Sequence, residues 1–583
     1  MKQKTFKRTV VSAAVLLASA NASAALYEVV EVTPPNSGYA SAFGVAIQKG
    51  NLSGDPVLGC FDDSATIGTC ESDFALAGET RSVAINAGQA VDGISYREEA
   101  PWAMDNAFIY IQDQDAFEDY CDSELLYATC ESWAKVRWDV WNDEKSGDTT
   151  PNAIAFLEES GSPTLVDTDG TNNTVINSVD SNGDATGIKL AAGEVTYADD
   201  DGGYVRSDVS QLYSGSTSLT APSGDAVRAW KYDATNDFIS GSIGTSYSTD
   251  NGKYYYTKAA LWNAAGDSVQ LNWPSGTDPE EDDRLSQGSM RDFYVDTTND
   301  VIYGVGYNTF DDDEHYMNAA VFKVSYTGSS DTSWQTASNW TTTVVSNAES
   351  EDSDDYIYSN SKLTAINENL IAIGEAKRDG DHPKNGAANN RMFVVSDVTS
   401  PSATYFSGGI FFTGAGGKAE AINDYNEIVG QVDAENVREK DGKVRRKRAF
   451  IYPYSGTGTE STRRAIFNNQ AWWLDNLTNG GTYSSANNAY RIIDASDIND
   501  AGVISATALK CDGGYDSTDY DATCGDGKQD ESVVSVKLVP IPGATSSDIS
   551  ERGESDDSTS RSGGAFGYGA LILLGFLGFR RRK

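Results

Sequence analysis

Histidine, the side chain most often used for proton transfer near neutral pH, occurs only at His315 and His382. Their polar surroundings predict two exposed loop residues. Two histidines exclude a multi-histidine zinc cage, and the chain lacks G-x-S-x-G, H-E-x-x-H and P-loop motifs. This favours a non-catalytic protein over a Ser-His-Asp site. The remaining catalytic alternative is a pair of carboxylates, which cannot be selected from 86 acidic residues without geometry.

Two acidic segments, 167–170 and 180–184, resemble the first residues of calcium-binding loops. An EF-hand needs Gly and Glu at its sixth and twelfth positions, but counting from Asp180 these are Ala185 and Ala191. Ordinary solvated turns are therefore the favoured interpretation, and Ca²⁺ is the only cofactor that the sequence suggests. Its candidate ligands are Asp167, Asp169, Asp180, Asn182 and Asp184.

The chain carries a formal net charge of −42, which argues against nucleic acid as a partner because the phosphate backbone would be repelled. One basic run, 445–448, interrupts the acidic sequence. A solvated loop that offsets local acid is the favoured interpretation, and a contact for an anionic envelope component is the alternative.

Six cysteines lie in three close pairs, which is typical of disulfides in an exported chain. We expect three local loops, although fifteen pairings are formally open. A metal site is disfavoured because C-x-x-C spacing and nearby histidine are absent. The expected pairs are Cys60–Cys70, Cys121–Cys130 and Cys511–Cys524.

The N-terminus has the organisation of a signal peptide. A basic start precedes a short apolar stretch, and Ala22-Ser23-Ala24 forms an A-x-A cleavage site. We therefore predict that residues 1–24 are removed by signal peptidase between Ala24 and Ala25, and that the body is exported. A membrane anchor is less favoured because the apolar stretch is short.

The C-terminus combines Gly563-Gly564, an apolar segment at 565–579 and a basic end at 580–583. At about 1.5 Å per residue the apolar segment is short for a bilayer core of about 30 Å. The basic end would remain cytoplasmic, leaving the body outside. The paired glycines before the helix form a flexible backbone site that a protease can easily unwind.

This tail resembles the GlyGly-CTERM sorting signal of Gram-negative envelope proteins. The resemblance implies a rhomboid-type sorting protease as a partner and transient inner-membrane anchoring through the C-terminal helix. It also implies cleavage near Gly563-Gly564, followed by release or attachment at the cell surface. A stable single-pass anchor is the alternative.

A repeat runs through the body. Ala421-Ile422-Asn423 is followed by Ile428-Val429-Gly430 and then by an aromatic-rich segment, 449–452. Similar patterns occur at 84–110, 365–395 and 497–536, and looser copies at 230–262 and 294–322. Each copy predicts a short strand, a tight turn, a second strand and a third strand after a polar connection.

Such a unit cannot bury both faces alone, so the copies must pack together. High Gly and Tyr content with little Met also favours an all-β chain. We predict a β-propeller of about six to eight irregular blades spanning 25–542; a β-sandwich array or a β-solenoid is the alternative.

The unit Ala-Ile-Asn-Asp…Ile-Val-Gly…Ala-Phe resembles the HAF-type extracellular repeat, with the best match at 421–452. The copies at 84–110 and 365–395 lack the Asp. With the tail, the whole chain resembles an uncharacterised family of exported Gram-negative bacterial proteins. The resemblance implies an exported β-rich module without catalytic residues.

Two segments depart from the repeat. Residues 114–150 have helical spacing of apolar residues and predict a small helical insertion stapled by a disulfide. Residues 543–562 are rich in Ser and acid and predict a disordered linker before the tail at 563–583.

The favoured function is an exported, surface-associated protein for binding, adhesion or envelope organisation, with glycans or other envelope components as partners. The alternative is an exported glycan hydrolase that uses paired carboxylates on the propeller face. A calcium-stabilised structural module is a third hypothesis.

Overall fold

The computed structural model describes residues 25–554, with gaps at 83–112, 127–129, 160–161, 169, 194, 198–203, 207–208, 216–218, 250–251, 282–283, 311–314, 354 and 439–444. The predicted signal peptide, the repeat copy at 84–110 and the tail at 563–583 lie outside the described residues. No helix in the described part of the chain is long and apolar enough to cross a membrane.

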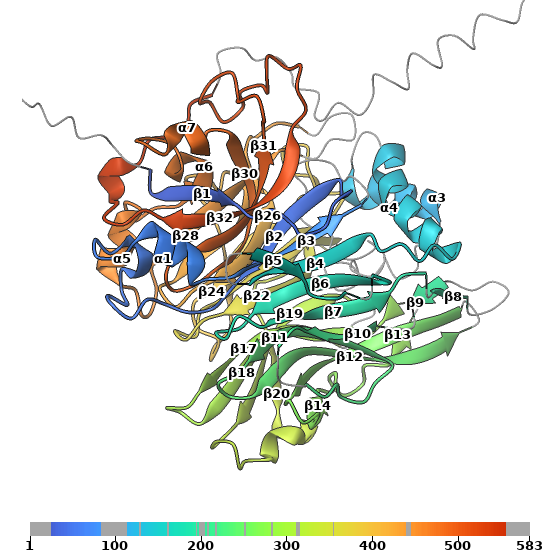
Figure 1. Ribbon diagram of the computed structural model, residues 1–583. Coiled ribbons are helices and arrows are strands. Elements are labelled where there is room, and N and C mark those ends of the chain that lie inside the picture. The colour runs from blue at the N-terminus through green and yellow to red at the C-terminus, as the bar shows by residue number, and fades with distance from the viewer. Residues whose placement is uncertain are drawn as a thin grey trace, which may run out of the picture.

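The described residues are mostly antiparallel β-strands with few helices, which confirms the predicted all-β class (Figure 1). An eight-stranded sheet contains β30 (Tyr490–Ile498), β31 (Ile504–Lys510), β32 (Ser532–Pro540), β2 (Ser41–Ile47), β3 (Leu76–Arg81), β4 (Ala153–Glu159) and β5 (Ser162–Leu165), with β1 (Tyr27–Glu31) on β32. A seven-stranded sheet contains β14 (Ser268–Gln270), β13 (Gly252–Trp262), β12 (Phe238–Thr249), β11 (Ala226–Asp233), β10 (Val209–Tyr213), β7 (Ala185–Ala191) and β6 (Asn172–Val179).

Three further sheets follow in chain order. The first contains β17 (Gly288–Asp296), β18 (Val301–Thr309), β19 (Met317–Ser325) and β20 (Thr341–Val344). The second contains β21 (Ser350–Asp352), β22 (Asp355–Ile366), β23 (Ala372–Arg378), β24 (Arg391–Val395) and β25 (Ala403–Tyr405). The third contains β26 (Gly417–Ile422), β27 (Glu427–Asp433), β28 (Lys447–Pro453) and β29 (Trp472–Trp473).

Two small hairpins and several short helices lie outside these sheets. The hairpins are β8 (Val195–Tyr197) with β9 (Tyr204–Arg206), and β15 (Glu280–Glu281) with β16 (Arg284–Leu285). The helices are α1 (Ile67–Ser72), α3 (Gln114–Tyr120), α4 (Cys130–Lys145), α5 (Ser461–Ile466), α6 (Leu474–Leu477) and α7 (Ser484–Asn487).

The two largest sheets are each two meanders joined at one point. Ser41 pairs with Val533 in a single parallel bridge between β2 and β32, and Val209 pairs with Ala226 in the same way between β10 and β11. Separating the meanders there gives seven units. We refer to β2, β6, β11, β17, β22, β26 and β30 as their first strands, although in one unit the short strand β21 precedes β22.

The seven first strands contact one another in a closed ring. In chain order each touches the next, and β30 touches β2. Apolar side chains fill the space between neighbouring units: Phe238 and Leu261 of one sheet share a core with Phe293 and Phe322 of the next. The ring arises because each unit buries a face against both neighbours.

The last unit is completed by the first strand of the described chain. β1 pairs antiparallel with β32, with Tyr27 opposite Pro540 and Glu31 opposite Val536 (Figure 1). Asn487 supports this strand from its other side: its side-chain amide donates to the Tyr27 carbonyl at 2.9 Å and accepts from the Val29 N–H at 3.0 Å. The two ends of the body are therefore held in one sheet.

The asparagines of the repeat connect neighbouring units. The Nδ2 atom of Asn367 donates to the Asn423 carbonyl at 3.0 Å, and that of Asn423 donates to the Asn499 carbonyl at 3.1 Å. Asn499 continues the series by donating to the Gln48 carbonyl at 3.1 Å. The Oδ1 atom of Asn423 meanwhile accepts from the Glu427 N–H within its own turn, at 3.0 Å. The Ala-Ile-Asn motif thus forms both the predicted turn and a contact between units.

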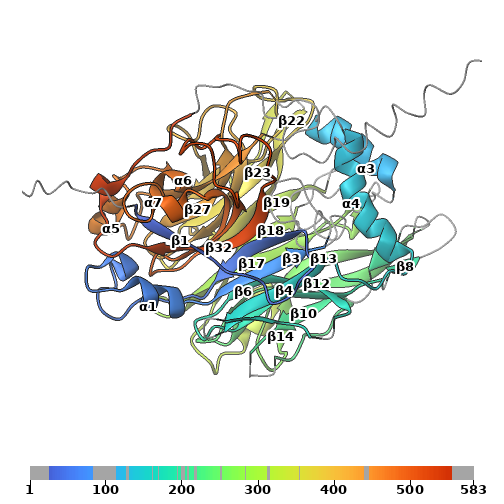
Figure 2. The same cartoon turned by 45° about the horizontal axis from the view of Figure 1, so that its top comes forward.

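The predicted helical insertion and disulfides are present. α3 and α4 lie at one edge of the molecule, away from α5–α7, and are joined by Cys121–Cys130 (Figure 2). The other bonds are Cys60–Cys70 and Cys511–Cys524, which confirms three local loops.

The segment after β32 remains in contact with the body up to Glu554, beyond the expected linker start at 543. Arg552 is buried, and its Nε atom donates to the Asp475 carbonyl at 2.9 Å. The polar composition of 543–554 favoured a linker. The burial of Arg552 could not be foreseen, because a single buried arginine leaves no periodic signal in the sequence. Residues 555–562 lie outside the described part of the chain.

Candidate functional site

A β-bulge interrupts each of the seven first strands where it pairs with its second strand. At each bulge one residue has no partner in register, which re-aims its side chain relative to the regular alternation. The extra residues at the bulge nearest the turn of each unit are Val45, Asn177, Trp230, Arg291, Thr364, Glu420 and Ser496. β22 and β30 each have a second irregularity farther from the turn.

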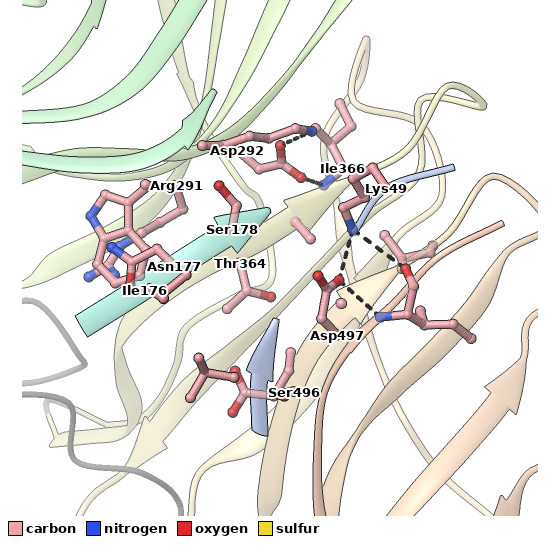
Figure 3. A pocket seen from close by; sticks show the side chains of 18 of the residues that line it. Lys49, Ile176, Asn177, Ser178, Arg291, Asp292, Thr364, Ile366, Ser496 and Asp497 are labelled. Carbon is pink, nitrogen blue, oxygen red and sulfur yellow. Dashed lines mark hydrogen bonds and ion pairs between the residues drawn. The ribbon is translucent and has the colours of Figure 1, made fainter. Parts of the chain in front are cut away.

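All seven bulge residues line one cavity of about 330 Å³. Figure 3 shows four of them, Asn177, Arg291, Thr364 and Ser496, contributed by four different strands. Bulges are common beside binding sites because they turn side chains toward a shared space. We refer to these residues as the bulge ring.

The sequence contained a signal for the bulge ring that the repeat analysis missed. In the copies at 364–367, 420–423 and 496–499, the ring residue comes directly before the Ala-Ile-Asn or Asp-Ile-Asn motif. The motif itself was conspicuous because it is nearly constant, whereas the preceding position varies among Thr, Glu and Ser. The nearly constant motif therefore forms the turns and the contacts between units, and the variable residue before it lines the cavity.

On one side of the cavity, Arg291 is held by aromatic rings. Its guanidinium carbon lies 3.5 Å from the centre of the Trp230 ring and 5.4 Å from that of Tyr307. Stacking on an aromatic face orients a guanidinium and leaves its N–H groups at the edge. Arg228 also lines this side, and it is buried.

The carboxyl groups of Glu420 and Asp494 line the cavity on the side away from Trp230. Burial is the main cause of a raised pKa for Glu420, and the nearby Lys418 ammonium opposes the effect. Burial, with a smaller contribution from the Glu420 charge, raises the pKa of Asp494 to about 7. Asp494 Oδ1 is buried without a hydrogen-bond partner among the described residues.

A buried ion pair adjoins these carboxyls. Lys362 Nζ lies 3.3 Å from Glu375 Oε1, and burial lowers the pKa of Lys362 although Glu375 opposes the shift. The second oxygen of Glu375 has no hydrogen-bond partner in the described part of the chain. The middle of the cavity therefore combines basic and acidic side chains with incompletely satisfied oxygens.

Asn367, Asn423 and Asn499, whose amides connect neighbouring units, are called the Asn ladder. At this end of the cavity, two lining aspartates also bridge neighbouring units. Asp497 accepts from Lys49 Nζ at 2.8 Å (Figure 3). It also accepts from the Ile47 N–H at 3.1 Å. Asp292 likewise accepts from Lys231 Nζ at 2.5 Å, and from the Ile366 N–H at 3.0 Å. The carboxylates of Asp497 and Asp292 therefore connect neighbouring units at this end of the cavity.

The raised pKa of Asp494 predicts a pH-dependent stability. Native Asp494 keeps its proton to about pH 7, whereas in the unfolded chain it loses the proton near pH 4. Between these values the native state binds more protons, so stability falls as the pH rises. Asp494→Asn should remove this cost, and its melting temperature relative to wild type should be higher at pH 8 than at pH 5.

Calorimetry at both pH values checks this expectation. Asp397→Asn, at an exposed position, is the matched control and should show the same difference from wild type at both pH values. An Asp494→Asn difference that does not change with pH would contradict the assignment.

The proposed calcium ligands serve other contacts where they are described. Asp167 pairs with Lys189 at 3.0 Å, and Asp180 accepts from the N–H groups of Asn182 and Asp184 at 2.8 and 2.9 Å. Asp184 accepts from the Tyr213 hydroxyl at 3.1 Å, and Asp169 lies outside the described residues. The described residues contain no group of three His, Cys, Asp or Glu side chains suited to a metal ion.

The histidines differ from the expectation of two exposed residues. His315 is buried, and its Nδ1 lies 3.4 Å from Ser286 Oγ. That hydroxyl donates to the Asp278 carbonyl at 2.6 Å, which does not suit a serine nucleophile with histidine as its base. His382 is half-buried beside Asp379. Tertiary packing covers His315 even though its neighbours in sequence are acidic.

The four residues of the basic run at 445–448 form ion pairs within the fold. Arg445 is fully buried against Asp433, with Nη1 at 3.0 Å from Oδ2, and Lys447 pairs with the same carboxylate. Arg446 pairs with Glu435 at 2.7 Å and Arg448 with Asp475 at 3.2 Å. Each basic side chain has an acidic partner, and Arg445 and Arg448 are buried, so the expectation of a solvated loop is wrong for this run.

Residues 214–582 match the model of a family described as "Protein of unknown function (DUF3466)". The chain belongs to this family. The match includes five of the seven bulge-ring residues, from Trp230 to Ser496, so most of the cavity lies within the family region. A search of curated proteins found no match.

Solved structures give distant similarities. An inulosucrase from Halalkalicoccus jeotgali bound to kestose is 10% identical with a TM-score of 0.25, covering 75% of this chain and 91% of that one. A Trypanosoma rangeli sialidase mutant with trans-sialidase activity is 8% identical with a TM-score of 0.24, covering 69% and 51%. Bacillus subtilis levansucrase is 8% identical with a TM-score of 0.22, covering 68% and 93%. Similarities this low carry no argument about function.

Proposed function

We propose that this protein is an exported, surface-associated β-propeller of seven blades that binds a small polar ligand in its central cavity without transforming it. Three features support the propeller: seven antiparallel units, a closed ring of first strands, and a last sheet that β1 completes. Such closure is typical of radially repeated sheets.

The observation that carries the binding function is the bulge ring. Every unit places one extra residue at its bulge, and all of these residues face the same cavity. Packing alone would favour apolar residues there, but six of the seven are polar, charged or indole side chains. A few convergent polar groups in a concave site are typical of small-molecule binding, and the cavity volume lies at the small end of that class.

Export is supported by three disulfides, because such bonds persist mainly outside the cytoplasm. We further propose that signal peptidase removes residues 1–24 and that a rhomboid-type protease acts near Gly563-Gly564, releasing the body to the cell surface. Intact-mass analysis after cell fractionation tests both steps. A mass that retains residues 580–583, in the inner membrane, would replace the sorting proposal with a stable anchor.

A ligand panel tests the binding function. The full chain should show a raised melting temperature with one class of small polar compounds or glycans, and the compounds should be recovered unchanged. Thr364→Leu and Ser496→Leu, which fill the ring with apolar groups, should abolish the shift. The matched controls Thr399→Leu and Ser547→Leu lie at exposed positions and should retain it. Retained binding in both ring variants would contradict the proposal.

The glycan-hydrolase alternative is favoured by one observation: Glu420 and Asp494 line the same cavity, and the pKa of each is raised. A carboxyl group that is protonated near neutral pH can act as a general acid. Release of reducing ends from a panel glycan, lost in both Glu420→Gln and Asp494→Asn, would establish this activity. Binding without release would exclude it for the glycans tested.

A further inference from the structure

We infer that the central cavity takes a sugar acid, meaning a monosaccharide-sized polyol that carries one carboxylate. The inference rests on the proposed binding function and adds the chemical class of the ligand. It combines two properties of the lining: unsatisfied hydrogen-bonding groups of both kinds, and an oriented guanidinium among basic side chains.

The unsatisfied groups fit a polyol. Asp494 Oδ1 is a buried acceptor, Trp230 Nε1 is a buried donor and Ser178 Oγ can do either; none of these atoms has a hydrogen-bond partner among the described residues. All three residues line the cavity, and Asp494 is only 5% exposed. A hydroxyl group both donates and accepts, so a ligand with several hydroxyls can satisfy all three atoms, whereas an apolar ligand would leave them unsatisfied.

The charges fit an anionic group on that ligand. Five acidic residues line the rest of the cavity. Asp497 pairs with Lys49, Asp292 with Lys231 and Glu79 with Arg81, whereas Asp424 and Asp500 lie together near the asparagine contacts between units. The middle of the cavity is also lined by Arg228, Arg291 and Lys418, facing Glu420 and Asp494. Among these five residues the three basic side chains outnumber the two carboxyls, and burial raises the pKa of both carboxyls, which favours their uncharged forms.

Arg291 supplies the geometry for a carboxylate. Its guanidinium lies over the Trp230 ring and within cation–π distance of Tyr307, and these contacts orient it. A planar fork matches the two oxygens of a carboxylate, and a lysine ammonium cannot reproduce this arrangement. A cationic ligand is disfavoured by the same three basic residues. The lining as a whole contains seven acidic and six basic residues, so the excess of basic side chains is confined to the part of the cavity around Arg291.

Matched sugar pairs test the inference. Isothermal titration of the full chain with D-glucuronate and D-galacturonate should show binding, whereas D-glucose and D-galactose should bind at least tenfold more weakly. Sodium acetate at the same concentration reports what the carboxylate contributes without the polyol. Wild-type binding of the uronates should weaken in 0.5 M NaCl less than expected for exposed charges, because the pair is buried.

Two variants locate the binding. Arg291→Lys keeps the charge and removes the planar fork, and Lys418→Gln removes a charge; each should weaken uronate binding at least tenfold. The control for the first is Arg391→Lys, which alters an arginine that lies 4.3 Å from the Tyr405 ring centre outside the cavity. It should bind uronate as wild type does.

The outcomes separate this inference from the proposed function. Equal binding of neutral and acidic sugars, lost in the Thr364→Leu variant, would overturn the sugar-acid inference and leave the cavity as a binding site. Uronate binding that is unaffected by Arg291→Lys and Lys418→Gln would overturn the inference by placing the acid elsewhere. An absence of any uronate binding would also overturn it, and the proposed function would then depend on the wider panel.

Discussion

Arg463→Met is expected to lower the free energy of unfolding by about 3–5 kcal/mol, the cost of leaving a buried charge without its partner. Arg463 is fully buried in α5, and its Nε and Nη2 atoms donate to the two oxygens of Glu427 at 2.7 and 2.9 Å. Its Nη1 donates to the Leu58 carbonyl at 2.8 Å. The arginine therefore joins β27 to the segment around the Cys60–Cys70 loop.

The effect should extend to the Asn ladder, because Glu427 Oε2 also accepts from Asn423 Nδ2 at 2.7 Å. Chemical denaturation measures the loss. The double variant Arg463→Met with Glu427→Gln should regain part of it, since no unpaired charge then remains buried. Arg464→Met, which loses partly exposed contacts to the Pro453 and Asn469 carbonyls, is the neighbouring control and should cost about 1 kcal/mol. A loss in Arg463→Met no larger than in this control would refute the interpretation.

Asn487→Ala should destabilise the protein by about 3 kcal/mol or more, because three buried backbone groups lose their partner together. The side chain donates to the carbonyls of Tyr27 and Thr478, both at 2.9 Å, and accepts from the Val29 N–H. Leaving each of these buried groups without a hydrogen-bond partner costs about 1–3 kcal/mol. The loss should appear first as increased hydrogen exchange in β1, since Asn487 is its support opposite β32.

Asn488→Ala provides the matched control for this prediction. Asn488 is adjacent in sequence but only half-buried, and its amide donates to side-chain oxygens of Ser484 and Asn479. Its replacement should leave exchange in β1 unchanged. If Asn487→Ala raises exchange evenly across the sheets without an early effect in β1, closure does not depend on this contact.

The elements of the fold could be predicted because their signals are local. The copies at 365–395, 421–452 and 497–536 each correspond to three consecutive strands of one sheet, and the turn after Asn423 is formed by that residue's own side chain. The three disulfides also follow from short spacing. The role of the asparagine amides between units has no local signal, since each partner lies in another repeat.

The candidate site could not be predicted for the same reason. Trp230 and Arg291 stack on each other although they lie in different units, and Asp494 faces Glu420 across another unit boundary. Their neighbours in sequence do not reveal these pairs. The basic run at 445–448 and the acidic surroundings of His315 were misleading because local composition does not report burial: Arg445 and His315 are both covered by distant segments.

The pairing of β1 with β32 also limits the order in which parts of the chain can fold. The first described strand begins two residues after Ala25, and Ala25 and Leu26 are themselves buried. Its partner is the last strand of the body, so the strand that is synthesised first must wait for the one that is synthesised last. Until residues 532–540 are available, β1 and the open edge of β2 lack their partner strand, and such unpaired edges can pair with other chains. The ring of units can therefore close only after the whole body has been synthesised.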